Sequence, residues 1–254
     1  MKASKSHYSI TNGGHENAIV FIHGLFTNRR IFENAIGSIK GHTCIFIDLF
    51  AIAKDQKHYD LEVITEDLIV VLDELALKSA IFVAKGIGKD ITFQIGVRRP
   101  DLIKGEVFIG LMNNEVNPIL KAAEMELFEY MKNSGDGQAL TALLNKIMNL
   151  STTGAEDSYA NELLENIKHE AFLNLYKNMH GKSHFSKKDY WDNTIPNVFL
   201  VPDSINPSVI ENNGGRLGYN KSVQKIKDIS TDWGLVCSKR FPSELEKSLM
   251  CLYN

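Results

Sequence analysis

The sequence lacks any long apolar run. Its longest uninterrupted apolar stretches, such as residues 18–22 and 68–72, contain five residues. A membrane-spanning helix needs about 20 apolar residues, so we expect no membrane span. Residues 1–5 carry positive charge, but no apolar segment follows them. We therefore expect no secretory signal either.

Cysteine is scarce. The three cysteines, Cys44, Cys237 and Cys251, are odd in number, stand at unrelated spacings and form no C-x-x-C pair. This pattern predicts neither a disulfide framework nor a zinc cage, and we expect no metal site. Free thiols fit a reducing compartment, so the expected location is the cytoplasm.

The sequence also lacks a large excess of positive or negative residues. The chain has 28 Lys and Arg against 31 Asp and Glu, a net charge of −3, and no basic run beyond pairs such as Arg29-Arg30. Nucleic-acid binding needs a basic patch, so we exclude nucleic acid as an expected partner. With 254 residues, 44% apolar and 23% charged, the chain has the composition of a globular protein with a sizeable core.

Short apolar runs alternate with longer periodic segments from residue 18 to residue 110. The predicted strands cover residues 18–22, 43–47, 80–84 and 107–109. The predicted helices cover residues 28–40, 61–77 and 88–98. Asp60 is the expected N-cap of the second helix, and Pro100 ends the third. Because the strands are continuously apolar, we expect a mostly parallel sheet with helices on both faces.

The chain changes character between residues 113 and 190, which are predicted to be helical and are interrupted at 134–137 and 151–154. A strand is then expected at 198–201 and another near 225–229. Pro242 opens a last predicted helix. We therefore expect one α/β core domain, residues 1–112 and 191–254, that carries an inserted helical cap of residues 113–190.

Several motifs occur in a recognisable order. They are residues 7–14, the Ile-Val-Phe-Ile-His-Gly-Leu-Phe segment 19–26, Phe-Ile-Asp-Leu at 46–49, residues 80–105, and 195–201. This order resembles the α/β-hydrolase fold superfamily, in particular its small capped esterases and lyases. In that comparison residues 7–22 look like the first hairpin and strand, and residues 80–105 look like the nucleophile strand, its sharp turn and the following helix. The resemblance covers about residues 6–112 and 190–254.

The resemblance implies a catalytic Ser, an acid and a His in that chain order. In the G-x-S-x-G register this sequence reads Ala-Lys-Gly-Ile-Gly over residues 84–88, so Gly86 stands at the nucleophile position. Glycine has no nucleophilic side chain, yet it adopts the positive φ of such a turn without steric cost. We therefore expect the turn to be present and the nucleophile to be absent.

The other two members of the implied triad also depart from the pattern. After the strand that ends at Val201, Asp203 comes early and Asn206 stands nearest the position of the acid. The histidine is expected after the last strand, but the final histidine of the chain is His184, and Leu235 occupies the expected position. The sequence thus predicts that serine-type hydrolysis is absent.

An oxyanion-binding scaffold is expected to remain. The resemblance implies that backbone N–H groups of Leu25 (or Phe26) and Ile87 point at one spot. With Gly86 and Leu235 they would line a pocket beneath the cap. The expected ligand is a small apolar molecule that carries a carbonyl or a carboxylate, and no cofactor is expected.

Two hypotheses of function follow. In the first, the protein is a carrier, sensor or partner subunit that binds its ligand without reaction. In the second, it is a cofactor-free lyase, cyclase, isomerase or oxygenase that uses His23, Asp48 or Asp203 for proton transfer. Each of these three residues has a structural alternative, as a turn histidine, a turn aspartate or a solvated loop residue, and Lys85 is either an amine nucleophile or a packing residue.

A third hypothesis is a purely structural subunit whose pocket is filled by its own side chains. A protein partner or a second copy of the chain stays open in all three hypotheses.

Overall fold

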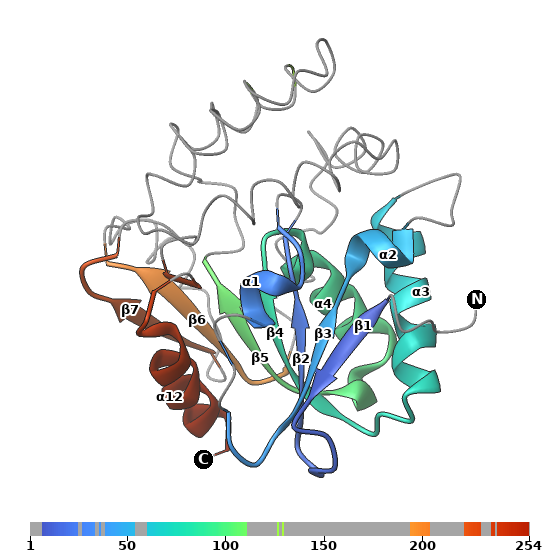
Figure 1. The fold of residues 1–254 in the computed structure, drawn as a ribbon, viewed down its shortest axis with the longest axis horizontal. Coiled ribbons are helices and arrows are strands. Elements are labelled where there is room, and N and C mark those ends of the chain that lie inside the picture. The colour runs from blue at the N-terminus through green and yellow to red at the C-terminus, as the bar shows by residue number, and fades with distance from the viewer. Residues whose placement is uncertain are drawn as a thin grey trace.

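The computed structural model describes residues 7–24, 27–33, 36, 39–53, 60–110, 126, 129, 194–203, 221–229, 235, 236 and 238–253 (Figure 1). Its strands form one seven-stranded sheet in the order β1-β3-β2-β4-β5-β6-β7. The strands are β1 (Tyr8–Thr11), β2 (Ala18–Ile22), β3 (Thr43–Ile47), β4 (Ala80–Lys85), β5 (Ile103–Ile109), β6 (Asn197–Pro202) and β7 (Lys221–Ile226). Only β1 pairs antiparallel with its neighbour, so the sheet is mostly parallel as predicted.

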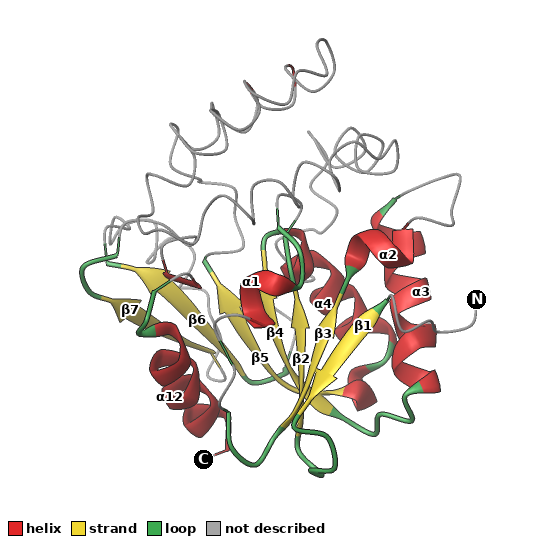
Figure 2. Ribbon diagram, viewed as in Figure 1, coloured by secondary structure: helices red, strands yellow, loops and turns green. Residues whose placement is uncertain are grey.

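Helices cover both faces of this sheet. They are α1 (Arg30–Glu33), α2 (Leu49–Ala53), α3 (Leu61–Glu74), α4 (Ile87–Arg98), the 3-10 helix η1 (Pro100–Leu102) and α12 (Phe241–Tyr253). Figure 2 shows α1 and α12 on one side of the sheet and α2, α3 and α4 on the other.

Two apolar cores lie between the sheet and its helices. In β2, Ile19 and Phe21 join the core beneath α1 and α12, whereas Val20 and Ile22 join the core beneath α3 and α4. All five residues of β2 are buried. The prediction that the central strands are buried on both faces is confirmed.

Most strand predictions agree with the structure, and two need correction. Strands 18–22 and 43–47 have the predicted bounds. β5 begins at Ile103 instead of 107 because η1 leads directly into it, and the polar Lys104 and Glu106 interrupt the apolar pattern. The last strand is Lys221–Ile226 rather than 225–229. It lies at the sheet edge, where a continuous apolar run is not required.

The helix predictions hold best where a local signal marks an end. Asp60 caps α3, and its Oδ1 accepts a hydrogen bond from the Val63 N–H at 2.9 Å. α3 stops at Glu74 rather than 77, just before Ala76 adopts a φ of 52°. Of the predicted helix 28–40, the described part is helical only in α1. The short helix α2 was not predicted from the sequence.

The expected first hairpin is wrong in its pairing. β1 pairs with β3, and β3 lies between β1 and β2. β2 already has β3 and β4 as parallel neighbours, so no position beside β2 is left for β1. Residues 7–22 therefore supply two strands of the sheet that are not paired with each other.

The predicted cap, residues 113–190, lies outside the described residues except for Glu126 and Glu129, which are helical. The domain division therefore stays a prediction. Within the described ranges, no helix has the length and apolar character needed to cross a membrane.

Candidate functional site

The sharp turn expected at Gly86 is present between β4 and α4. Gly86 has φ 55° and ψ −128°, a conformation that glycine adopts far more easily than other residues. Gly86 is exposed, while its neighbours Lys85 and Ile87 are buried. Solvent thus reaches the backbone at the point where the resemblance places the nucleophile.

Two glycines hold this turn close to the end of β2. A Cβ atom added to Gly88 would lie 2.4 Å from the carbonyl oxygen of Ile22, so only glycine fits at this position of α4. A Cβ atom on Gly86 would lie 3.2 Å from the Cα atom of Gly24. The start of α4 therefore packs directly against the backbone at the end of β2.

The turn after β2 is closed by Thr27, a residue that the sequence analysis did not single out. The Thr27 hydroxyl accepts a hydrogen bond from the Gly24 N–H at 2.8 Å and donates one to the Gly24 oxygen at 2.9 Å. The Thr27 N–H donates to the same oxygen at 3.2 Å. Leu25 and Phe26, which stand between Gly24 and Thr27 in the sequence, lie outside the described residues. The oxyanion-binding pair with Ile87 therefore stays a prediction.

His23 is held by the backbone on both sides of its ring. Nε2 accepts a hydrogen bond from the Leu49 N–H at 3.1 Å, which assigns the proton to Nδ1. Nδ1 in turn lies 2.8 Å from the Gly24 oxygen and donates to it. The residue is fully buried, and this burial lowers the pKa of His23 below its ordinary value of 6.5. This geometry supports the structural alternative, a neutral link between the end of β2 and α2.

Asp48 and Asp203 also make backbone contacts. The Asp48 carboxylate accepts a hydrogen bond from the Ala51 N–H at 3.0 Å and so caps the start of α2. Asp203 is exposed, and its carboxylate accepts a hydrogen bond from the Asp228 N–H at 3.2 Å. Asp48 follows β3 and Asp203 follows β6, with three strands between them. The structure therefore does not bring these two candidates together.

Leu235 lies in the connection between β7 and α12, where the resemblance places the base. It is fully buried in the core beneath α1 and α12, together with Phe241 and Leu245. Asn206 lies outside the described residues. Leu235 is thus surrounded by apolar residues. That Leu235 lines a ligand pocket stays a prediction.

Lys89 and Asp90 stand at the site although the sequence analysis did not nominate them. Lys89 is 7% exposed, and its Nζ donates a hydrogen bond to the Ile109 oxygen at 3.1 Å. Burial raises the pKa of Asp90 to about 6, against the opposing effect of the Lys89 ammonium. The sequence feature that could have identified Lys89 and Asp90 is their position, three and four residues after Gly86, in the first turns of the helix that follows it.

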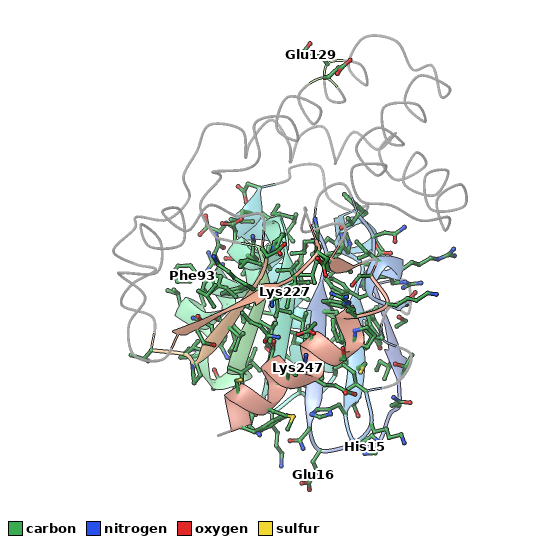
Figure 3. The ribbon with its side chains drawn as sticks, turned by 90° about the vertical axis from the view of Figure 1, so that its left-hand side faces the viewer. His15, Glu16, Phe93, Glu129, Lys227 and Lys247 are labelled. Atoms are coloured by element: carbon green, nitrogen blue, oxygen red, sulfur yellow. The ribbon has the colours of Figure 1, made fainter. Side chains whose placement is uncertain are left out.

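All these groups lie at the carboxyl edge of the sheet, where the parallel strands end. Figure 3 shows the opposite edge, marked by His15 and Glu16 in the turn before β2. In open α/β sheets, ligands bind outside the carboxyl ends of the strands. Among the described residues, no group of three or more His, Cys, Asp or Glu side chains is placed to hold a metal ion.

Comparison with family models and with curated proteins finds no match. The structure resembles a carboxylesterase from Nitrososphaera gargenis with a TM-score of 0.75 at 13% identity, over 100% of this chain and 98% of that one. It resembles MenH from S. aureus with a TM-score of 0.70 at 14% identity, over 98% and 99% of the two chains.

A third similar structure is that of an enzyme described as an alpha/beta hydrolase. MGS-M2, an alpha/beta hydrolase enzyme from a Medee basin deep-sea metagenome library, has a TM-score of 0.69 at 16% identity and covers 97% of this chain and 92% of its own. At such identities the likeness shows the fold. The protein has the α/β-hydrolase fold, as the order of its motifs predicted.

Proposed function

We propose that this protein binds a small apolar molecule with a carbonyl or carboxylate group at the Gly86 turn, and that it does not act as a serine hydrolase. In this role it is a carrier, a sensor or the ligand-binding subunit of a larger assembly. The conformation and exposure of Gly86 carry the proposal. An exposed glycine backbone allows a ligand to approach closely, and a nucleophilic side chain is missing at this position.

The missing base supports the same conclusion. No histidine follows His184, so the connection from β7 to α12 contains none. His23 precedes Gly24, which packs against the Gly86 turn, and it uses both ring nitrogens for backbone hydrogen bonds. His23 is therefore not placed to take the proton of a serine at residue 86.

The second hypothesis, a cofactor-free enzyme without hydrolytic activity, keeps one specific observation in its favour. Asp90 lies in the first turns of α4, and burial raises its pKa to about 6. A carboxyl group that titrates near neutral pH suits general acid or base chemistry. His23, Asp48 and Asp203 support this hypothesis less well, because each is bonded to the backbone.

The proposal is tested by incubating the purified protein with a metabolite extract and recording by mass spectrometry what stays on the protein and what is consumed. A compound retained unchanged supports the binding function and identifies its class. A compound converted to a new product supports the enzyme hypothesis instead. If nothing is retained or consumed, the binding function is wrong and a structural subunit is favoured.

A matched pair of variants localises the retained compound. Gly86→Ala adds a methyl group at the turn, whereas Gly41→Ala adds one at another positive-φ glycine with no atom within 4 Å of the new Cβ. Both variants carry the backbone strain of an L-residue at positive φ. We expect retention to be lost in Gly86→Ala and kept in Gly41→Ala.

The Gly86→Ser variant tests the loss of hydrolysis. We expect hydrolysis of a p-nitrophenyl ester series to stay at the level of the unchanged protein, because the base is still missing. Gly41→Ser is the control for backbone strain, and circular dichroism confirms that both variants are folded. Rapid ester turnover by Gly86→Ser, but not by Gly41→Ser, would show that a functional base exists and that the proposal is wrong.

A further inference from the structure

The ring of His23 joins two separate segments of the backbone at the carboxyl edge of the sheet. Nδ1 donates a hydrogen bond to the Gly24 oxygen at 2.8 Å, and Nε2 accepts one from the Leu49 N–H at 3.1 Å. Gly24 lies just after β2, and Leu49 is the first residue of α2, at the carboxyl end of β3 (Figure 1). A neutral imidazole with its proton on Nδ1 satisfies both bonds. His23 thus links the end of β2 to the start of α2.

The bond between His23 and Leu49 is incompatible with a protonated ring. An imidazolium carries a proton on both nitrogens and has no acceptor. The Leu49 N–H and the Nε2–H of His23 would then face each other as two donors. Because His23 is fully buried, neither donor can turn to water without a movement of the backbone. The end of β2 and the start of α2 must therefore separate to accommodate the protonated ring.

Two charged side chains act on the ring of His23. The Asp48 carboxylate favours the protonated form, and the Arg29 guanidinium opposes it. Burial has the largest effect and lowers the pKa of His23 below 6.5. On the side of α2, the ring of Phe50 packs against His23, with centroids 5.3 Å apart. Asp48, directly before Leu49, is therefore the anion that stabilises the imidazolium when it forms.

The first turn of α2 is the segment that can respond. α2 contains only five residues, fewer than an isolated helix needs to be stable. Its first N–H groups are held by side chains: that of Leu49 by His23, and that of Ala51 by Asp48. β2, in contrast, is paired with a strand on each side. The buried side chains of Leu49 and Ile52 hold the helix to the core. A local opening is therefore expected in the first turn of α2, while the sheet stays intact.

We propose that His23 is a pH-sensitive latch: protonation of its ring releases the first turn of α2 from the end of β2, and Asp48 stabilises the protonated form. The latch lies beside the candidate site, because a Cβ atom placed on Gly86 would be 3.2 Å from the Cα atom of Gly24. It is a conformational device that goes beyond the proposed binding function. The inference holds whether or not the Gly86 turn binds a ligand.

Amide hydrogen exchange of the full chain, followed by NMR from neutral pH downwards, tests the release. We expect the protection factor of the Leu49 N–H to fall by up to about tenfold per pH unit once His23 titrates, the limit for one proton. The Val63 N–H, bonded to the Asp60 carboxylate at the start of α3, should keep its protection, as should Val83 in the middle of β4. If Leu49 loses protection only together with Val83, the protein unfolds globally and the latch is wrong.

A second measurement shows whether the ring is protonated in the folded protein. In protein labelled with 15N-histidine, the ring nitrogen resonances report the tautomer and the charge of His23, which is assigned through its own backbone, so no variant is needed. We expect the neutral form with the proton on Nδ1 at neutral pH. Its titration midpoint should coincide with the loss of Leu49 protection. A ring that stays neutral while Leu49 loses protection would overturn the inference.

Variants separate the roles of the two side chains. His23→Gln keeps a donor and an acceptor but does not titrate, so the protection of Leu49 should no longer depend on pH. Asp48→Asn keeps the oxygen that caps the Ala51 N–H and removes the charge, so we expect His23 to titrate at a lower pH. Asp60→Asn makes the same change at the cap of α3 and should leave the His23 midpoint unchanged. A midpoint shifted by neither variant, or equally by both, would contradict the role of Asp48.

Discussion

Two regions of this molecule differ in how their polar side chains are bonded: in one they are buried and bond to the backbone, and in the other they form ion pairs at the surface. At the carboxyl edge of the sheet, His23 and Thr27 are fully buried and bond to backbone groups of the turn after β2 and of α2. On the outer surface of the α3–α4 layer, Arg98 and Arg99 form ion pairs with partly exposed carboxylates. Buried polar groups are costly unless satisfied, whereas exposed pairs contribute little.

The difference indicates which region is constrained. Hydrogen bonds at the carboxyl edge fix the backbone of Gly24, and the Gly86 turn packs against it, so a change there is expected to alter the geometry of the turn. Ion pairs on the α3–α4 surface can be lost without moving the backbone. The molecule thus combines buried, backbone-bonded polar side chains at the end of β2 with an exposed glycine at the adjacent turn, the feature on which the proposed binding function depends.

The largest effect on this comparison is expected from Gly88→Ala. The new Cβ would lie 2.4 Å from the Ile22 oxygen, so α4 must move away from β2. We expect a loss of about 3–5 kcal/mol in the free energy of unfolding, measured by urea denaturation. Gly96→Ala, in the same helix, is the control, because its new Cβ meets the flexible end of Ile195 at 3.0 Å. A similar loss in both variants would contradict the special role of Gly88.

Thr27→Val removes the hydroxyl that closes the turn after β2 while keeping the shape of the side chain. The buried Gly24 N–H then loses its acceptor, and we expect a loss of about 1–3 kcal/mol in the free energy of unfolding. Thr65→Val is the matched control. Its hydroxyl only donates to the helix carbonyl of Leu61, so its loss should stay under about 1 kcal/mol.

The lowered pKa of His23 predicts that the free energy of unfolding depends on pH. Because burial lowers its pKa below the ordinary value of 6.5, the unfolded chain takes up a proton before the folded protein does as the pH falls. Stability that is present above pH 6.5 is therefore lost below it, with a slope that approaches about 1.4 kcal/mol per pH unit. Denaturation at a series of pH values measures this slope.

The contribution of His23 is isolated by subtraction. His23→Gln keeps a donor and an acceptor but does not titrate, so the difference between this variant and the unchanged protein should vanish progressively below pH 6.5. Asp90 titrates in the same range, with its pKa raised to about 6, and it is present in both proteins. Parallel profiles for His23→Gln and the unchanged protein would contradict a buried neutral imidazole.

The sequence could predict features that depend on neighbouring residues, but not features that depend on residues far apart in the chain. Strand 18–22 and the N-cap Asp60 follow from local patterns: a continuous apolar run and a polar residue before a periodic segment. The turn at Gly86 was implied by the resemblance in motif order. The contacts His23–Leu49 and Lys89–Ile109 join residues 26 and 20 positions apart. No local pattern encodes such contacts, because they depend on which strand ends meet.

The position of β1 illustrates the same limit for the fold. Its pairing with β3 rather than β2 depends on β2 being enclosed by β3 and β4, which is a property of the whole sheet. The nomination of His23 and Asp48 as candidate catalytic groups followed from their places at strand ends. Their backbone partners could be identified only once α2, a helix of five residues, was known.

The smallest effect is expected on the α3–α4 surface. Arg98→Met removes the ion pairs with Glu62 and Glu66, whose N–O distances are 2.9 Å and 3.4 Å, but retains an apolar stem. Exposed pairs are worth about 0–1 kcal/mol and are screened by salt. We therefore expect a loss below about 1 kcal/mol in low salt that disappears in 1 M sodium chloride. A loss as large as that of Thr27→Val would show that this surface supports the fold as strongly as the carboxyl edge does.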